Sequence, residues 1–334
     1  MKALDTLWTS ARSRVRQERA RWGRPGAPAW MALQLDDMDA PVPAGATEPL
    51  APSRTAEAWS ADLARFVAEY GTIPVRVTAH ATSALLPDVV RFAYRLDCLV
   101  SVRTCAQGLD TARAEAILGA GATRVEVRVA GATDAVQNAV LGEDVGTARD
   151  AFAALLGARA RLGGIPAGRP RVLAEWVLNA GGASDLRQIF DEARRAGLDG
   201  VRIGVPWTGV EALLADPGVH AALAWARTQR APFHATSTEV LDRLAGARTG
   251  EGEAGEGGAP GLSRRSGRCA VGGLRVTVAV DGGHAACPFH AGATRPTSDD
   301  EDATSVRERL VGHVAATRAC TRHCLHPEVL PLSP

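Results

Sequence analysis

The sequence predicts an α/β fold: a partial, open, TIM-like (βα)6 barrel, followed by a small C-terminal extension of one β-hairpin and one helix. Apolar, β-branched runs alternate along the chain with Ala-, Leu- and Arg-rich stretches that have helical periodicity. Short connections that contain glycine separate them, which is the pattern of repeated βα units around a parallel sheet. About six units are present, whereas a closed TIM barrel has eight.

Six strands and six helices are expected between residues 29 and 230. Continuous apolar character, as in residues 172–178, favours strands that are buried on both faces. The Ala-Gly pairs at 120–121 and 196–197 favour helix ends just before a strand. The expected strands are 29–35, 73–78, 99–104, 124–129, 171–178 and 200–205, and the expected helices are 58–70, 88–96, 111–119, 147–162, 185–196 and 210–229.

Composition divides the chain into four regions. Residues 1–28 are expected to form a basic helix, either a plain surface helix or a docking helix for an acidic partner, and residues 29–230 form the partial barrel. Residues 246–268 are rich in Gly, Glu, Ala and Arg, which predicts a flexible linker. Residues 269–328 form a cysteine-bearing domain, with a strand at 274–280, a tight Asp-Gly-Gly turn, a returning strand at 284–287 and a helix at 305–319.

The bulk composition excludes several classes of partner. The formal net charge is +1 over 334 residues, so no global field attracts the protein to nucleic acid or to acidic membranes. The first 24 residues lack the apolar core of a secretion signal, and no run of about 18 apolar residues is present. We therefore expect a cytoplasmic protein in a reducing compartment, where clustered cysteines indicate metal or redox chemistry more often than disulfides.

Four of the six cysteines lie in the C-terminal region with the spacing of metal ligands. Cys269 and Cys287 stand at the two ends of the expected hairpin, so the returning strand brings them together. Cys320 and Cys324 lie one turn apart if the preceding helix continues. Four thiolates suit tetrahedral zinc, and five histidines lie in the same region. These are His284, His290, His313, His323 and His326. The alternative is a set of free thiols.

Several local phrases resemble one known family. Residues 85–90 resemble the segment after its Gly-Gly-Glu-Pro motif, residues 103–110 the turn after its third strand, and residues 121–133 its fourth strand. Cys269-x12-Gly282-x4-Cys287 and Cys320-x3-Cys324 match parts of its C-terminal cysteine pattern. The chain thus resembles a radical SAM protein with a SPASM or twitch-type extension. The resemblance implies action on ribosomally made peptides. It also implies one auxiliary [4Fe–4S] cluster on the four tail cysteines, with zinc as the alternative.

The chain departs from that family at four positions of one site. The family cleaves S-adenosylmethionine (SAM) with a [4Fe–4S] cluster on three cysteines after its first strand, whereas residues 36–43 here contain aspartates and no thiol. Carboxylates are poor ligands for such a cluster. The Gly-Gly-Glu-Pro position reads His80-Ala81-Thr82-Ser83, and Cys105 and Ala130 replace the family's Asn and Asp. The sequence therefore predicts a degenerate, pseudoenzyme core without SAM cleavage.

Other chemistry at the vacated site has few candidates. Cys105 and His80 follow neighbouring strands and could form a thiolate–imidazole pair, or Cys105 could be a buried structural cysteine. Four carboxylates could bind a hard cation or belong to a solvated loop. They are Asp36, Asp37, Asp39 and Glu48. Trp176 and Trp207 could stack on a substrate at the barrel mouth or simply pack.

Three functions remain open from the sequence. The first is a non-catalytic or accessory component of a peptide-modifying system that binds a precursor peptide or an active partner enzyme. The second is a metalloenzyme that has abandoned SAM radical chemistry and uses the tail metal site, or the pair of Cys105 and His80. The third is a structural scaffold in which the tail metal only stabilises the fold.

Overall fold

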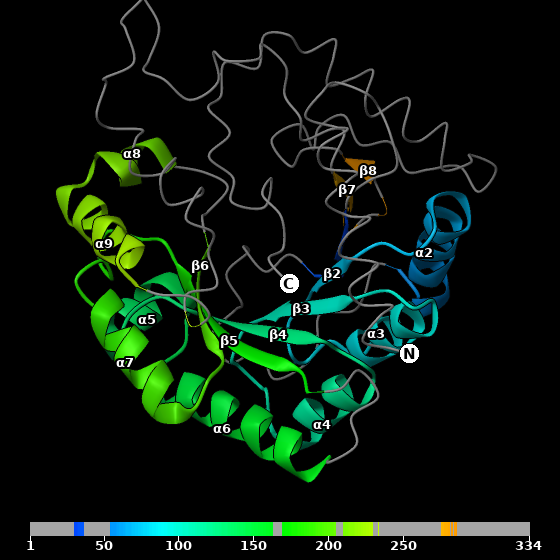
Figure 1. The fold of residues 1–334 in the computed structure, drawn as a ribbon, viewed down its shortest axis with the longest axis horizontal. Coiled ribbons are helices and arrows are strands. Elements are labelled where there is room, and N and C mark those ends of the chain that lie inside the picture. The colour runs from blue at the N-terminus through cyan, green and yellow to red at the C-terminus, as the bar shows by residue number, and fades with distance from the viewer. Residues whose placement is uncertain are drawn as a thin grey trace, which may run out of the picture.

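One sheet organises the part of the protein that the computed structural model describes. These residues are 30–36, 54–162, 169–204, 210–229, 233, 275–280, 282 and 284–285. Within them the strand order is β6-β5-β4-β3-β2-β1-β7-β8, and all neighbours are parallel except β7 and β8 (Figure 1). The strands are β1 (Trp30–Gln34), β2 (Val75–Thr78), β3 (Val100–Thr104), β4 (Arg124–Val129), β5 (Arg171–Val177), β6 (Gly200–Gly204), β7 (Arg275–Val278) and β8 (His284–Ala285).

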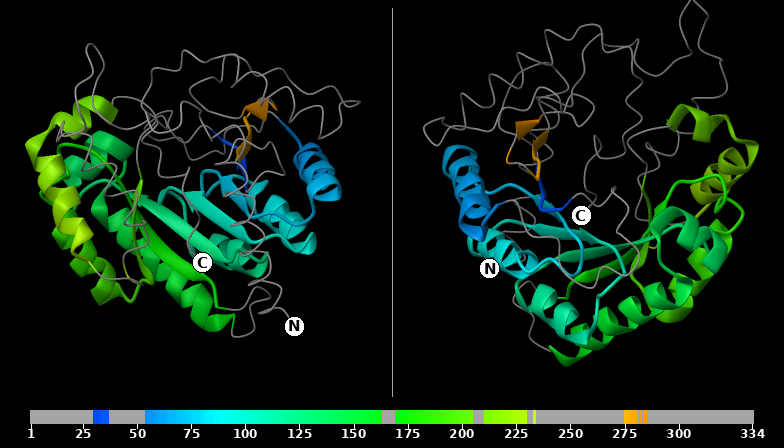
Figure 2. Two further views of the ribbon diagram at one scale, coloured as in Figure 1. Left: turned by 45° about the horizontal axis from the view of Figure 1, so that its top comes forward. Right: turned by 180° about the vertical axis from the view of Figure 1, so that it is seen from behind.

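Helices line the outer side of this sheet, as Figures 1 and 2 show. Among the described residues they are α2 (Ala56–Tyr70), α3 (Leu86–Arg95), α4 (Thr111–Gly119), α5 (Asp134–Leu141), α6 (Val145–Arg161), α7 (Leu186–Ala196), α8 (Val210–Ala215) and α9 (Pro217–Arg227). None of them combines the length and the apolar character that crossing a bilayer requires. The sheet runs from an edge at β6 to an edge at β8, so the described strands do not close into a ring.

The predicted fold class is confirmed. Each of the six strands expected between residues 29 and 230 is present, and strands β1 to β6 end within two residues of the expected positions. Side-chain caps explain several helix starts. Asp110 accepts a hydrogen bond from the Arg113 N–H at the start of α4, and Asp144 accepts one from the Thr147 N–H at the start of α6.

Two helices differ from the sequence prediction. The single helix expected at 210–229 is split into α8 and α9, because Asp216 caps a new helix and Pro217 occupies its first turn. Helix α5 was not expected at all. It has eight residues and ends at Gly142, whose φ of +72° is the left-handed conformation that favours glycine.

The hairpin expected in the cysteine-bearing region is present as β7 and β8, with Thr277 paired to Ala285. It also extends the barrel sheet, because β7 lies parallel to β1 and pairs Met31 with Val276. The N-terminal basic helix, the linker and the helix expected at 305–319 lie outside the described residues.

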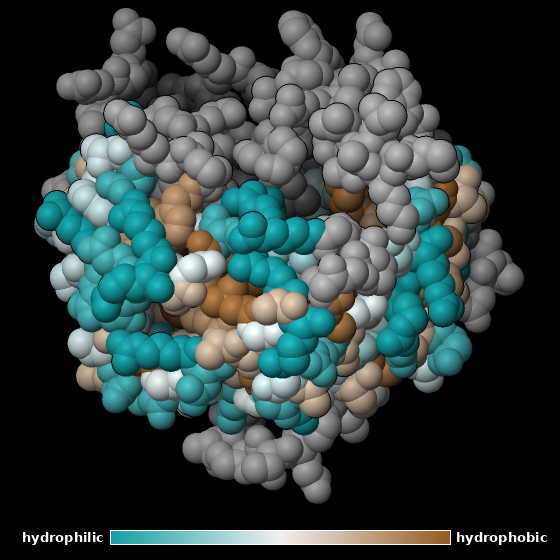
Figure 3. Space-filling view, turned by 60° about the horizontal axis from the view of Figure 1, so that its bottom comes forward, coloured by the Kyte–Doolittle hydropathy of each residue, from teal (hydrophilic) through white to brown (hydrophobic). Residues whose placement is uncertain are grey.

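The two faces of the sheet have opposite chemistry. On the helix side, alternate residues such as Val77, Val102, Val127 and Ile203 are fully buried and form one apolar core with the helices. Each such side chain contributes about 1.5–3 kcal/mol by leaving water. The outer surface of the helices is mainly hydrophilic (Figure 3). The opposite, inner face of the sheet carries charged side chains, which lie in the site described next.

Candidate functional site

Four polar side chains gather where the strands end. Asp36 follows β1, His80 follows β2, Cys105 follows β3, and Glu143 lies between α5 and α6. The carboxyl ends of parallel strands share one edge of a sheet, and folds of this type place their active sites there. The C-terminal edge of the barrel is therefore the candidate functional site.

Cys105 and His80 meet at this edge. The His80 Nδ1 atom lies 3.2 Å from the Cys105 Sγ atom, so the two side chains suggested by the sequence are in hydrogen-bonding contact. The backbone N–H of His80 donates to the Asp36 carboxylate over 2.9 Å. The His80 Nε2 atom is buried and has no hydrogen-bond partner within the part of the chain that the structure describes. The Nδ1 atom of His80 is thus held by Cys105, whereas its buried Nε2 atom has no such contact among the described residues.

The thiol of this pair is protonated at neutral pH. Burial raises the pKa of Cys105 above its ordinary value, the Ala81 N–H lowers it, and the nearby Glu143 carboxylate raises it again. A thiol is a much weaker nucleophile than a thiolate, so the resting pair is not activated. Cys98, by contrast, is buried in the core, as the sequence analysis expected, and burial raises its pKa to about 11.

Asp36 has a structural role. Burial raises the pKa of its carboxyl group, and the hydrogen bond from the His80 N–H lowers it. Its contact with His80 ties the end of β1 to the end of β2. Asp37, Asp39 and Glu48 lie outside the described residues, as do Cys269, Cys287, Cys320 and Cys324. Within the described ranges, no three His, Cys, Asp or Glu side chains are placed to hold a metal ion.

Of the two tryptophans that could stack on a substrate, Trp176 packs instead. Its side chain is fully buried on the helix side of the sheet, and its Nε1–H donates to the Ala130 carbonyl over 3.0 Å. Trp207 lies outside the described residues.

Glu143 was missed by the sequence analysis, together with α5. Its carboxylate accepts from the Gln107 N–H over 2.8 Å and from the Gln137 side-chain amide over 3.1 Å. The side-chain Oε1 atom of Gln137 accepts in turn from the Ala130 N–H over 2.8 Å. This buried chain joins the ends of β3 and β4 to α5. Nothing in the local sequence distinguishes Glu143 from a surface residue, because its burial depends on strands that lie far away in the sequence.

Glu143 is expected to make stability depend on pH. Burial raises its pKa to about 7 from 4.5, although the N–H donors lower it. The folded state therefore binds this proton more tightly than the unfolded state, and the stabilisation is lost as the pH rises from about 4.5 through 7. Relative to Glu143→Gln, the wild-type free energy of unfolding should fall by up to about 3 kcal/mol over this range, as measured by urea unfolding. A difference between the two proteins that stays constant over this pH range would contradict the prediction.

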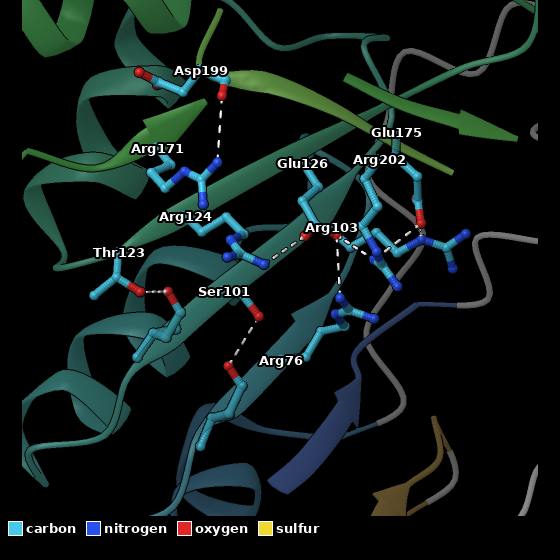
Figure 4. A network of polar contacts seen from close by, with 12 residues as sticks. Arg76, Ser101, Arg103, Thr123, Arg124, Glu126, Arg171, Glu175, Asp199 and Arg202 are labelled. Atoms are coloured by element: carbon cyan, nitrogen blue, oxygen red, sulfur yellow. Dashed lines mark hydrogen bonds and ion pairs between the residues drawn. The ribbon is translucent and has the colours of Figure 1, made fainter. Parts of the chain in front are cut away.

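The inner face of β2 to β6 carries a network of buried ion pairs (Figure 4). Glu126 lies 2.6 Å from Arg202, 3.3 Å from Arg76 and 3.5 Å from Arg124. Burial alone would raise the pKa of Glu126, but these guanidinium groups outweigh it and hold the pKa well below its ordinary value. Glu126 is therefore ionised at neutral pH.

A second carboxylate extends the network along the sheet. Glu175 contacts Arg103 at 2.5 Å and Arg202 at 3.3 Å. The sequence analysis did not identify this network. The sequence does indicate a charged face, because Arg-Val-Glu-Val-Arg-Val in β4 alternates charged and apolar residues. Strict alternation indicates a strand with one polar face rather than two apolar faces.

The comparisons with known proteins concern the fold. No protein-family model matches the sequence, and no curated protein matches it. Among solved structures, SuiB of Streptococcus suis bound to S-adenosylmethionine is similar, with a TM-score of 0.61 and 11% identity, covering 93% of this chain and 73% of that one. SuiB bound to its precursor peptide SuiA has a TM-score of 0.62 and 13% identity, covering 90% and 69%.

A third similar structure is native anSMEcpe with bound AdoMet. It has a TM-score of 0.51 and 12% identity, covering 85% of this chain and 82% of that one. These values establish a shared fold. The chain therefore shares the fold of SuiB and anSMEcpe, each of which is known in a structure with bound S-adenosylmethionine or AdoMet.

Proposed function

We propose that the protein is a non-catalytic or accessory component of a peptide-modifying system, which binds a precursor peptide or an active partner enzyme and does not cleave SAM. One observation carries the proposal: the end of β1, where the resembled family holds its cluster on three cysteines, carries Asp36. The Asp36 carboxylate accepts the His80 N–H, and no cysteine precedes Cys98 in the sequence. These residues do not fit an iron–sulfur cluster, because such clusters are held by thiolates.

The peptide part of the proposal draws on the fold. A structure of this fold, SuiB, is known in complex with a precursor peptide. The inner face of the sheet here is lined by charged side chains that pair with one another.

We expect no reductive cleavage of SAM. Purified protein is incubated anaerobically with SAM and a strong reductant, and 5′-deoxyadenosine is measured by chromatography. A radical SAM enzyme with an intact cysteine triad serves as the positive control. Production of 5′-deoxyadenosine above the protein-free background would overturn the proposal, whereas co-purification with a peptide or partner chain would support its second half.

We further propose that Cys269, Cys287, Cys320 and Cys324 hold one metal centre, either an auxiliary [4Fe–4S] cluster or zinc. The donor set supports both, since four thiolates are suited to each. The iron, sulfide and zinc content of anaerobically purified protein, together with its visible spectrum, distinguishes the two. Cys269→Ala should lose this metal, and an unchanged metal content would show that binding is adventitious.

A second candidate function is thiol chemistry at Cys105, which its 3.2 Å contact with His80 favours. If His80 serves as a base, Cys105 should react with iodoacetamide about tenfold faster in the wild type than in His80→Phe at pH 8. Mass spectrometry gives the site of modification, and the buried Cys98 provides the internal control. Equal rates in the two proteins would leave Cys105 as a structural residue.

A further inference from the structure

Glu143 is fixed against the backbone that follows Cys105. Its buried carboxylate accepts a hydrogen bond from the Gln107 N–H over 2.8 Å, and Gln107 lies two residues after Cys105. The Ala106 N–H also donates to this carboxylate. The second carboxylate oxygen accepts from the side-chain amide of Gln137 over 3.1 Å. The connection between α5 and α6 thus brings a carboxylate to the end of β3, beside the thiol.

All of these neighbours donate hydrogen bonds to Glu143. The amide of Gln137 cannot turn its oxygen toward Glu143, because that oxygen accepts from the N–H groups of Ala130 and Gly131 over 2.8 Å and 3.3 Å. A carboxylate fits such a set of donors, whereas a protonated carboxyl group finds no acceptor for its proton among them. Burial favours the neutral form and the donors favour the charged form, and the pKa of Glu143 is about 7 as a result.

The charge on Glu143 acts on Cys105. Burial raises the pKa of the Cys105 thiol, the Ala81 N–H lowers it, and the Glu143 carboxylate raises it again. The last effect is repulsion, because ionisation of the thiol would place a second negative charge near the first. Cys105 is partly exposed, so its ionisation can be followed with a small reagent.

Other charged or titratable groups surround this pair. From β4, Arg128 lowers the pKa of both the Cys105 thiol and the Glu143 carboxyl group. After β2, His80 contacts the thiol, and after β1, Asp36 contacts the backbone of His80. At the starts of the two flanking helices, the aspartates are exposed to solvent: Asp134 in α5 and Asp144 before α6. The thiol and the Glu143 carboxyl group therefore compete for the negative charge that Arg128 favours.

We propose that Glu143 controls the reactivity of Cys105 through its charge: ionised Glu143 holds the thiol in its protonated, unreactive form, and neutral Glu143 allows it to ionise more easily. Glu143 is thus a regulatory residue of the site and not a catalytic one. Control of this kind rests on the thiol chemistry proposed for Cys105 and is independent of whether the protein cleaves SAM.

The test follows alkylation of Cys105 by iodoacetamide in the full chain between pH 6 and pH 9.5, with mass spectrometry of the peptide that contains Cys105. The thiol loses its proton to the buffer, and the thiolate sulfur forms a bond to carbon as iodide leaves. At pH 6 most Glu143 is neutral, so the wild type and Glu143→Gln should react at nearly equal rates. Above pH 8 the variant should react about threefold faster. A thiol pKa lower by about one unit gives about tenfold more thiolate, and the weaker nucleophilicity of a less basic thiolate offsets about a factor of three.

Asp144→Asn is the matched control. It makes the same change of charge one residue further along the chain, on an exposed side chain, and Asn still caps a helix. Its rate should equal that of the wild type at every pH, because exposed charges are screened. Acceleration by Glu143→Gln of the same size at pH 6 and pH 8.5 would overturn the inference, since it would indicate easier access to the thiol. Equal rates for the wild type and Glu143→Gln, or equal acceleration by Asp144→Asn, would also overturn it.

His80→Phe separates this inference from the function on which it rests. If His80→Phe reacts as fast as the wild type while Glu143→Gln reacts faster only above pH 8, the thiolate–imidazole pair is refuted and control by Glu143 stands. If Glu143→Gln does not fold, as judged by circular dichroism, the profile of His80→Phe decides, because this variant lacks the imidazole that contacts the thiol. Its rate should rise by less than tenfold per pH unit between pH 6 and pH 8, and a tenfold rise per unit throughout would overturn the inference.

Discussion

Glu126→Gln is expected to destabilise the protein by about 3–5 kcal/mol, the cost of removing one partner from a buried ion pair. The side chain of Glu126 is fully buried, and its charge faces Arg76, Arg124 and Arg202, whose side chains are at most 12% exposed. A neutral amide can accept from one guanidinium group but presents its own N–H groups to another. The midpoint of urea unfolding at pH 7 measures the effect.

The matched control is Glu192→Gln on the outer helix α7. Glu192 pairs with the exposed Arg149 over 3.1 Å, and exposed ion pairs contribute about 0–1 kcal/mol. The pH gives a second check. The folded pKa of Glu126 is lowered, so its stabilisation is present above the unfolded value and is lost as the pH falls below about 4.5 toward the folded pKa. An effect of Glu126→Gln no larger than that of Glu192→Gln would show that the network is not a buried unit.

Gly182→Ala is the second substitution with a large expected effect. A Cβ atom at Gly182 would lie 2.1 Å from the Ala130 carbonyl oxygen, a backbone atom that cannot move as a side chain does. That oxygen already accepts hydrogen bonds from Trp176 Nε1 and Asn179 Nδ2. The turn after β5 must therefore separate from the end of β4, at a cost of about 2–3 kcal/mol or more.

The neighbouring glycine supplies the control. A Cβ atom at Gly181 would meet nothing closer than 3.6 Å, so Gly181→Ala is expected to change the free energy of unfolding by less than about 1 kcal/mol. Both variants are compared with the wild type by urea unfolding. Equal effects of the two substitutions would show that the approach of Gly182 to β4 is not as close as described.

The sequence predicted the alternation of strands and helices because each strand and helix is encoded locally. Strand β4 and helix α4 begin and end at the expected residues. The break between α8 and α9 is also encoded locally, although the sequence analysis did not identify it. Asp216-Pro217 is a strong helix-start signal inside the single helix expected at 210–229. Helix α5 was not predicted because its eight residues are too few to show a clear helical periodicity.

The candidate site was partly predictable. His80 and Cys105 were expected to be neighbours because both follow strands of one parallel sheet, and their side chains are in contact. Burial raises the pKa of the Cys105 thiol and keeps it protonated, and the charge of the nearby Glu143 carboxylate raises the pKa as well, neither of which a local pattern reveals. The charged inner face is indicated by the alternation of charged and apolar residues in β4, but the sequence analysis expected strands with two apolar faces.

The sequence by itself determined that the core has no cysteine before Cys98, and so no thiolates after the first strand. It also determined the order of the βα units, since these follow from residue types and their spacing. Only the tertiary structure decided which charges meet. Glu126 and Arg202 are 76 residues apart in the sequence and 2.6 Å apart in space, because strand register, which depends on the packing of the whole sheet, brings them together.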